Sequence, residues 1–389
     1  YRMAHMDRIQ IVNRERIEWC CAEQGIAPDA LADVLDMSAD RWSAFWFDNV
    51  GLTFNQLRKL ADHFGRGVLF FLESGPAVPD QVHTPQFRTL AQQKPELSHR
   101  LRLLIERVER QRSLFLSLRE DLDDTLWSPF NAPNLPMGNV AAAAKLARQW
   151  LSIAEEKNDF ESYRKAVEAK GILVFRTNGY NGPWQIAKES PVAGFALYDE
   201  KCPVIVVKKM ASDAPQAFTL IHELAHLLLH KASWIDDETD LGATQGREQE
   251  ANLFAGLILV PDYFLGSISD EKRPADVAAF NEWLKPHSKV WGVSTEVILR
   301  RLLAVGRLSQ ATYQAYRAWG LEAGQNVKEE GGTRMYRHRE PKHIFGDRFV
   351  RTVLNSLSAR RITLSKASSY LDSLKIADVH ELERHYAGA

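Results

Sequence analysis

The sequence predicts a mostly helical α+β protein of 389 residues with one small sheet near the middle of the chain. Three observations lead to this class. Apolar residues recur at helical spacing along most of the chain. Short apolar runs, the last of them rich in β-branched residues, follow one another between residues 171 and 209 and predict strands. Polar, proline-rich or glycine-rich stretches divide the chain, which is typical of a protein with several domains.

The first part, residues 7–75, predicts a small helical domain without strands, because residues such as Leu31, Leu57 and Leu60 suit the core of a helical bundle. Residues 76–138 predict a linker, GPAVPDQVHTP, followed by one long amphipathic helix. The proline-containing stretch WSPFNAPNLPMGN ends that helix.

A mixed α/β domain is predicted for residues 139–320. Two helices precede three strand candidates, which are GILVFRTN, VAGFALYD and CPVIVVKK. The next helix is APQAFTLIHELAHLLLH, with Pro215 suited to its first turn. Another helix, GREQEANLFAGLILVP, ends at Pro261. The polar stretch LEAGQNVKEEGGT then predicts a hinge before a helical C-terminal domain, residues 334–389.

Composition excludes several classes of protein. The formal net charge is −1, so no overall electrostatic field favours nucleic acid or a membrane surface. Cys20, Cys21 and Cys202 are spaced so that they build neither a disulfide framework nor a CxxC metal site, which indicates a reducing compartment. No apolar run approaches the ~18 residues of a membrane span. We therefore expect a cytoplasmic protein that does not contact a membrane.

The stretch FTLIHELAHLLLH, residues 218–230, predicts a metal site on a helix. His222 and His226 are four residues apart, so they share one helix face and can bind a single zinc ion. Glu223 lies beside them as a candidate general base. The alternative is a core helix whose histidines form ordinary hydrogen bonds. His230 continues the spacing, but a regular helix carries it ~6 Å further along the axis. We expect it next to the ligands rather than among them.

A third ligand is expected from the helix GREQEANLFAGLILVP. Glu248 and Glu250 point roughly 160° apart around a helix, so only one of them can face the metal. Glu250 is favoured because it stands one turn before Phe254 on an apolar stripe; the alternative is that both acids form solvated salt bridges. Zn²⁺ is the expected ion and Mn²⁺ the next candidate, because geometry and availability decide between such metals.

These motifs resemble the ImmA/IrrE family of bacterial metallopeptidases. FTLIHELAHLLLH, EQEANLFAGLILVP and the upstream GFALYDEKCPVIVVKK carry the resemblance, which covers about residues 140–310; the family pattern often has asparagine where this chain has Lys208. The resemblance implies a zincin-like domain with His222, His226 and Glu250 as ligands and Glu223 as general base. It also implies that a helix-turn-helix repressor is the substrate. CPVIVVKK would be the sheet edge that holds an extended substrate.

The run LADVLDMSADRWSAFWFDNVGLTFNQLRKLADHF resembles the Xre-type helix-turn-helix domain. SADRWSAFW would be the recognition helix, and Arg41 is its candidate for DNA contact. Residues 7–75 contain seven Arg/Lys and eleven Asp/Glu, which disfavours binding to phosphates. Contact with a protein is therefore favoured over DNA binding. Residues 334–389, with eleven Arg/Lys and six Asp/Glu, either contact an acidic partner or form a solvated surface.

Three functions remain open at this stage. The favoured one is a zinc endopeptidase that cleaves a regulatory protein in a phage, mobile-element, stress or toxin–antitoxin system. The first alternative is an antitoxin or partner-binding protein that clasps a co-encoded toxin and uses the protease fold as a scaffold. The second alternative is a DNA-binding transcription regulator.

Overall fold

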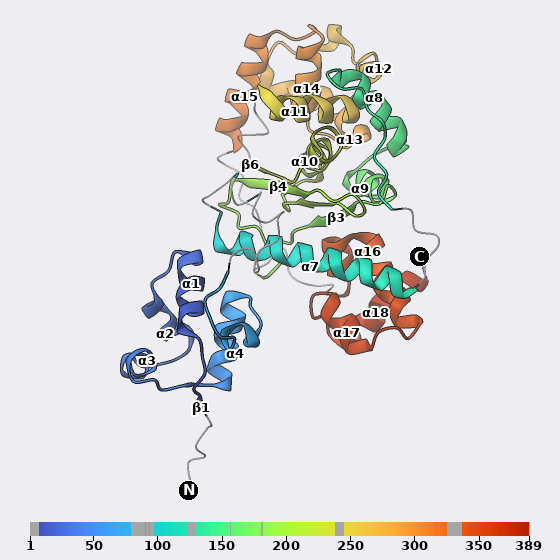
Figure 1. The fold of residues 1–389 in the computed structure, drawn as a ribbon. Coiled ribbons are helices and arrows are strands. Elements are labelled where there is room, and N and C mark those ends of the chain that lie inside the picture. Colours follow the sequence, from blue (N-terminus) through green and yellow to red (C-terminus); the bar gives the residue numbers. More distant parts are fainter. Residues whose placement is uncertain are drawn as a thin grey trace. The chain divides into compact units, whose positions relative to one another are not determined.

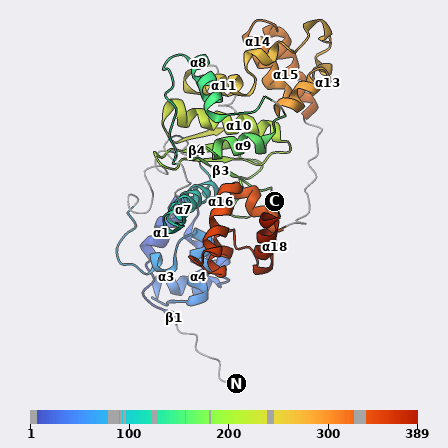
Figure 2. The same cartoon turned by 90° about the vertical axis from the view of Figure 1, so that its right-hand side faces the viewer.

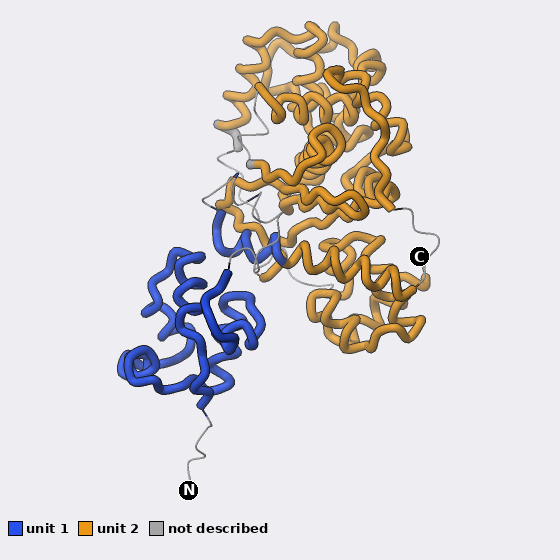
Figure 3. The backbone as a smooth tube through the Cα atoms, viewed as in Figure 1, with its two compact units in different colours: residues 1–106 blue, residues 107–389 orange. Residues whose placement is uncertain are grey.

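The chain divides into two compact units, residues 1–106 and residues 107–389 (Figure 3). Helix α7 (His99–Leu122) contains the division. Apart from the isolated positions 90 and 93, the computed structural model describes residues 8–78, 97–122, 129–155, 157–179, 182–237, 245–324 and 337–388. Within these residues, no helix has both the length and the apolar character that a membrane span requires.

The first unit is built from short helices around a buried core that includes Leu31, Phe45 and Leu60. Its described elements are β1 (Arg8–Ile9), α1 (Arg14–Gln24), η1 (Pro28–Ala30), α2 (Leu31–Val34), α3 (Ala39–Phe47), β2 (Leu52–Thr53), α4 (Phe54–Phe64) and η2 (Val68–Phe71). The prediction that this part contains no strand was wrong, because β1 and β2 form an antiparallel pair. Two residues per strand are too few to show alternation in a sequence.

The second unit contains a four-stranded sheet with the order β3-β5-β4-β6. Its strands are β3 (Leu173–Arg176), β4 (Val192–Leu197), β5 (Val204–Val207) and β6 (Trp234–Asp237). β3 and β5 are parallel, and β4 is antiparallel to both β5 and β6. The prediction that CPVIVVKK forms a sheet edge was wrong, because β5 lies inside the sheet. Its uninterrupted apolar run is typical of a strand buried on both faces.

Helices cover both faces of this sheet (Figures 1 and 2). Helices α9 (Phe160–Glu168) and α10 (Asp213–Ala225) cover one face, with α8 (Val140–Leu151) and α11 (Gly246–Leu259) packed behind α10. On the opposite face, Phe175 of β3 packs edge-on against Phe345 and Phe349 of α16 (Glu340–Ser358). The other helices are α12 (Asp262–Leu265), α13 (Phe280–Trp291), α14 (Thr295–Ala304), α15 (Gln310–Gly324), α17 (Leu364–Tyr370) and α18 (Ile376–Ala387).

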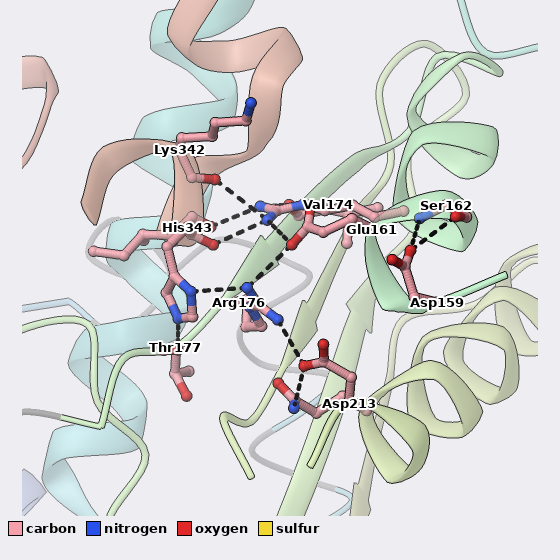
Figure 4. Close-up of polar contacts among 12 residues, drawn as sticks. Asp159, Glu161, Ser162, Val174, Arg176, Thr177, Asp213, Lys342 and His343 are labelled. Atoms are coloured by element: carbon pink, nitrogen blue, oxygen red, sulfur yellow. Dashed lines mark hydrogen bonds and ion pairs between the residues drawn. The ribbon is translucent and has the colours of Figure 1, made fainter. Parts of the chain in front are cut away.

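Helix α16 is fixed to β3 by the buried side chain of Arg164. The Arg164 guanidinium donates to the carbonyl oxygens of Lys342 (3.3 Å), His343 (2.9 Å) and Ile344 (3.1 Å), and also to Val174 of β3 (Figure 4). These carbonyls are free to accept because Gly346, with φ 80° and ψ 170°, interrupts the helix directly after them.

A second buried cation, Arg176, extends this network (Figure 4). It lies 3.0 Å from Glu161 and 3.3 Å from Asp213, and it donates to His343 Nδ1 at 2.8 Å. His343 Nε2 donates in turn to the Thr177 carbonyl at 3.2 Å. Burial and the neighbouring arginines lower the pKa of His343 to about 3, so its ring remains neutral and can accept from Arg176.

Candidate metal centre

Helix α10 carries the HELAH motif into the core of the second unit. It begins after Ser212, which has an extended backbone, and it continues as the π-helical segment η3 (His226–His230). Lys231 ends the segment in the left-handed conformation (φ 46°). π-Helical turns occur frequently at functional sites. The side chains of His222, Glu223 and His226 are fully buried in this helix, as the apolar flanks of the motif predict.

Four side chains converge beside this helix: His222, His226, Asp236 of β6 and Glu248 of α11. His222 Nε2 lies 3.2 Å from His226 Nε2, 3.2 Å from Asp236 Oδ2 and 3.2 Å from Glu248 Oε2. His226 Nε2 lies 3.2 Å from Asp236 Oδ2 and 3.6 Å from Glu248 Oε2. Two imidazole nitrogens and two carboxylate oxygens form a donor set that suits zinc.

The electrostatics of this cluster favour a bound cation. Burial alone would raise the pKa of Asp236, but hydrogen bonds from His222 and His226 outweigh it and hold the pKa well below its usual range. The same histidines lower the pKa of Glu248 against the effect of burial. In return, the two carboxylates overcome burial and raise the pKa of His222 to about 9. The two carboxylates therefore hold a proton strongly on His222, where a divalent cation would compensate the same negative charge.

The carboxylates of the cluster have no permanent cationic partner. In the part of the chain that the structure describes, no lysine or arginine forms an ion pair with Asp236 or Glu248. The fully buried Asp236 Oδ1 and the buried Glu248 Oε1 also have no hydrogen-bond donor among the described residues. Buried charges are stable when they are paired or when they coordinate a metal. The residues present thus fit a zinc ion.

The structure places Glu248, not Glu250, beside the two imidazoles, so the expected third ligand differs from the geometry. Glu250 is half-exposed and its Oε2 lies 3.2 Å from His230 Nε2. Helix α11 buries Ala251, Phe254 and Ala255 on more than one side. The stripe that contains Phe254 therefore did not identify the acid that faces the metal.

His230 lies beside the cluster and not in it, in agreement with the sequence analysis. Its Nδ1 is 2.9 Å from His226 Nδ1. When His226 Nε2 binds a metal, its proton is on Nδ1 and can be donated to His230 Nδ1. His230 Nε2 then donates to Glu250. This chain of hydrogen bonds fixes the tautomer and the ring orientation of His226. The buried His222 Nδ1 has no hydrogen-bond partner among the residues described.

Glu223 is fully buried between α10 and the sheet. A Cβ atom at Gly194 of β4 would lie 2.8 Å from Glu223 Oε1 and 2.7 Å from the methyl group of Thr219. Only a glycine at this point of the strand leaves room for the glutamate. Its position next to His222 in the chain is the one that the motif requires of a general base.

Asp236 was absent from the sequence-based set of candidate ligands. It belongs to β6, the strand that the sequence analysis did not predict. The run WIDDETD shows no clear apolar alternation, so it gave no signal of a strand. Its excess of carboxylates shortly after a helix with two histidines was the one available clue.

Arg41, the candidate for DNA contact, lies exposed on α3 in the first unit.

The geometry defines the class of protein domain first: a buried HExxH helix with carboxylates beside its imidazoles is the arrangement of a metallopeptidase. Comparison with family models agrees. Residues 167–303 match the model of the IrrE N-terminal-like domain (Peptidase_M78), and this range contains His222, Glu223, His226, Asp236 and Glu248. The match supports a metallopeptidase domain of the IrrE type. Comparison with curated proteins and with solved structures finds no match.

Proposed function

We propose that the protein is a zinc-dependent endopeptidase. The observation that carries the proposal is that His222 Nε2 and His226 Nε2, on the helix that also carries Glu223, converge with Glu248 Oε2 of α11 within 3.2 to 3.6 Å. Glu248 replaces the expected Glu250 as the third ligand. The match to the peptidase family over residues 167–303 supports the same activity.

In this proposal His222, His226 and Glu248 hold the zinc ion, which when bound supplies the Lewis acidity that activates water and polarises the substrate carbonyl. Glu223 accepts the proton of the attacking water on its carboxylate. It then passes that proton to the amide nitrogen as the carbon–nitrogen bond breaks. His230 and Glu250 keep the His226 ring oriented through both steps. Burial of Glu223 excludes bulk water from this proton transfer.

The proposed substrate is a regulatory protein, namely a helix-turn-helix repressor of a phage, mobile-element, stress or toxin–antitoxin system. The resemblance of the HELAH and EQEAN motifs to the ImmA/IrrE family supports this choice. The inner strand β5 does not bind the substrate by strand addition, because both of its sides pair with β3 and β4.

The first test is the zinc content of the protein by plasma mass spectrometry, followed by cleavage of the repressor encoded beside its gene. We expect about one zinc per chain. We also expect Glu223→Gln to keep the zinc and lose cleavage, since a general base contributes roughly 10²–10⁴-fold. Glu282→Gln, which removes an exposed ion pair with Lys285 on α13, is the matched control and should cleave at the wild-type rate. A Glu223→Gln variant that cleaves at the wild-type rate would disprove the proposal.

A second candidate function, binding of a partner protein such as a co-encoded toxin, is favoured by a groove in the first unit. Its volume is about 860 Å³, and α1, η1 and α3 line it. Trp42, Trp46 and Phe47 supply aromatic surface, and Phe47 is 84% exposed. Its charged side chains are the acidic Glu15, Glu18 and Asp29 and one cation, Arg14, which donates to the Phe45 carbonyl. This combination suits a basic protein segment with an apolar anchor, and the acids would repel DNA phosphates.

Substitutions in the groove separate this candidate from the peptidase and from a DNA-binding regulator. If the groove binds the toxin, Phe47→Ala and Glu18→Lys weaken the complex in a calorimetric titration. Phe54→Ala, which removes an aromatic ring that is 57% exposed outside the groove, does not. Equal affinities in all three variants exclude the groove. Salt-dependent binding to promoter DNA that is lost in Arg41→Ala would instead support the regulator.

A further inference from the structure

The geometry points to Asp236 as a fourth metal ligand that closes the site in the substrate-free protein, so that substrate binding must withdraw Asp236 from the metal before cleavage. This inference rests on the proposed peptidase function and adds a regulatory device to it. The zinc ligands inferred above, two histidines and one glutamate, leave one coordination position open. Asp236 is a further carboxylate from a different element, β6, and it is fully buried at that position.

The distances between the four donor atoms are the first support for Asp236 as a ligand. Zinc bonds to nitrogen and oxygen of about 2.0–2.1 Å place the corners of a tetrahedral site about 3.3 Å apart. Three of the measured distances join the imidazole nitrogens to each other and to Asp236 Oδ2, and all three are 3.2 Å. The two distances to Glu248 Oε2 are 3.2 and 3.6 Å. The sixth distance, between the two carboxylates, is within 4.8 Å.

The four donors therefore form a cage whose dimensions suit zinc without any further ligand. Zinc sites with four protein ligands are structural, whereas catalytic sites keep one position for water. Asp236 lies equally close to both imidazole nitrogens, which a carboxylate that only oriented one ring would not do. With Asp236 bound, an attacking water has no place beside Glu223. With Asp236 withdrawn, the remaining three ligands form an open catalytic site.

Asp236 also comes from the shortest of the three elements that supply donors. His222 and His226 lie on α10, and Glu248 lies on α11, which are packed against each other through the core. β6 has four residues and stands last in the strand order. Its pairing with β4 shifts register between Val192 and Gly194, directly opposite Asp237 and Asp236. Such irregularities change the direction in which side chains point, and they are frequent next to active sites. A local shift of Asp236 at this irregularity would withdraw its carboxylate, while Trp234 of the same strand stays stacked on His226 and the helices that carry the other ligands stay packed.

The test uses Co²⁺ as a spectroscopic substitute for zinc and azide as a small anionic probe of an open position. The full-length protein is stripped with a chelator, loaded with one equivalent of Co²⁺ and titrated with azide while the visible absorption is recorded. We expect the wild-type spectrum to be insensitive to azide. Asp236→Ala should change its spectrum with azide, and its Kd for Co²⁺ should rise by at least ~10-fold. Glu282→Ala, which removes an exposed carboxylate on α13, is the matched control and should remain insensitive.

The outcomes distinguish two proposals: that Asp236 closes the metal site, which is called the latch below, and that the protein is a peptidase. If the wild type binds azide as readily as Asp236→Ala, Asp236 is not a ligand, and the open peptidase site remains. If neither the wild type nor any variant binds Co²⁺, both proposals are overturned. Circular dichroism checks that Asp236→Ala is folded. If it is not, Asp236→Asn replaces it, because the amide keeps the size of the side chain but removes its charge, and an azide-insensitive spectrum in this variant also overturns the latch.

Discussion

The two ends of the central sheet both carry buried ionic clusters, but the clusters differ in where their positive charge comes from. At the β3 end, Arg164 and Arg176 provide permanent cations for Glu161, Glu168 and Asp213. At the β6 end, Asp236 and Glu248 face imidazoles, which are positive only when protonated. The first cluster is electrically complete within the chain and is structural. The second has no permanent cation among the described residues, which fits the metal centre proposed for this end.

The largest difference between the two ends is expected when one positively charged or metal-binding side chain is removed from each. His226→Ala should lose zinc almost completely, because one of the two imidazole ligands of the cluster is removed. Arg176→Ala should keep about one zinc per chain, since no permanent cation of the β3 end takes part in metal binding. Plasma mass spectrometry of both variants, purified without added metal, measures this difference. Retention of zinc by His226→Ala would mean that the β6 cluster is not the metal centre.

The β3 end should instead contribute to stability. At pH 8, above the pKa of about 7 that burial gives Glu168, Arg164→Ala leaves this carboxylate buried without its ion pair and leaves several backbone carbonyls without a donor. Removing one partner of a buried pair destabilises a protein by about 3–5 kcal/mol. Urea unfolding should show this loss in the free energy of unfolding. Arg351→Ala, which removes an exposed ion pair with Asp347 on α16, is the control and should lose at most ~1 kcal/mol.

The β3 end should also respond to pH through Glu168. Burial raises the pKa of this carboxyl to about 7 from its ordinary value of 4.5, and Arg164 opposes the shift only in part. Between these values the folded state binds more protons than the unfolded state, so stability falls as pH rises. Glu168→Gln removes this fall. Its stability relative to wild type should therefore increase from pH 4.5 to pH 7, by up to about 3 kcal/mol. A constant difference across this range would contradict the buried, protonated carboxyl.

The smallest effect is expected from the residues that support His226. His230→Gln interrupts the hydrogen bonds between His226 and Glu250, and loss of such a supporting residue weakens metal binding by about 10–100-fold. Competition with a coloured chelator measures the change in Kd. His343→Gln, at the β3 end, should leave the Kd for zinc unchanged. Equal effects of the two substitutions would show that the ends of the sheet are coupled.

The sequence predicted those residues of the candidate site that lie in a clear local pattern, and it missed those that do not. His222 and His226 were predictable because four-residue spacing on an apolar helix has one geometric meaning. Glu248 was missed because α11 is apolar on several sides, so periodicity could not choose between two acids two residues apart. Asp236 was missed because β6 is too short to show alternation and because its partner strand β4 lies about 40 residues earlier in the chain. Contacts of this kind depend on tertiary packing rather than on local preference.

The same limit applies to the fold. The helices and the three apolar strands of the second unit follow from local patterns, and an α+β architecture with a small sheet is what the structure has. The order of the strands does not follow from them. β5 was placed at an edge, although it pairs on both sides. The network around Arg164 joins residues about 180 positions apart and could not be read from either segment alone.

The metal donors are distributed over α10, β6 and α11, and the first and last of them are separated by 26 positions in the chain. During synthesis, the histidines of the HELAH helix are therefore added to the chain before the carboxylates proposed to bind the same ion. Metal loading is then a late event in the maturation of each molecule, after β6 and α11 have packed. Under the proposed function, a cell short of zinc would accumulate chains with an unloaded centre, so that zinc supply as well as synthesis would set the number of active molecules.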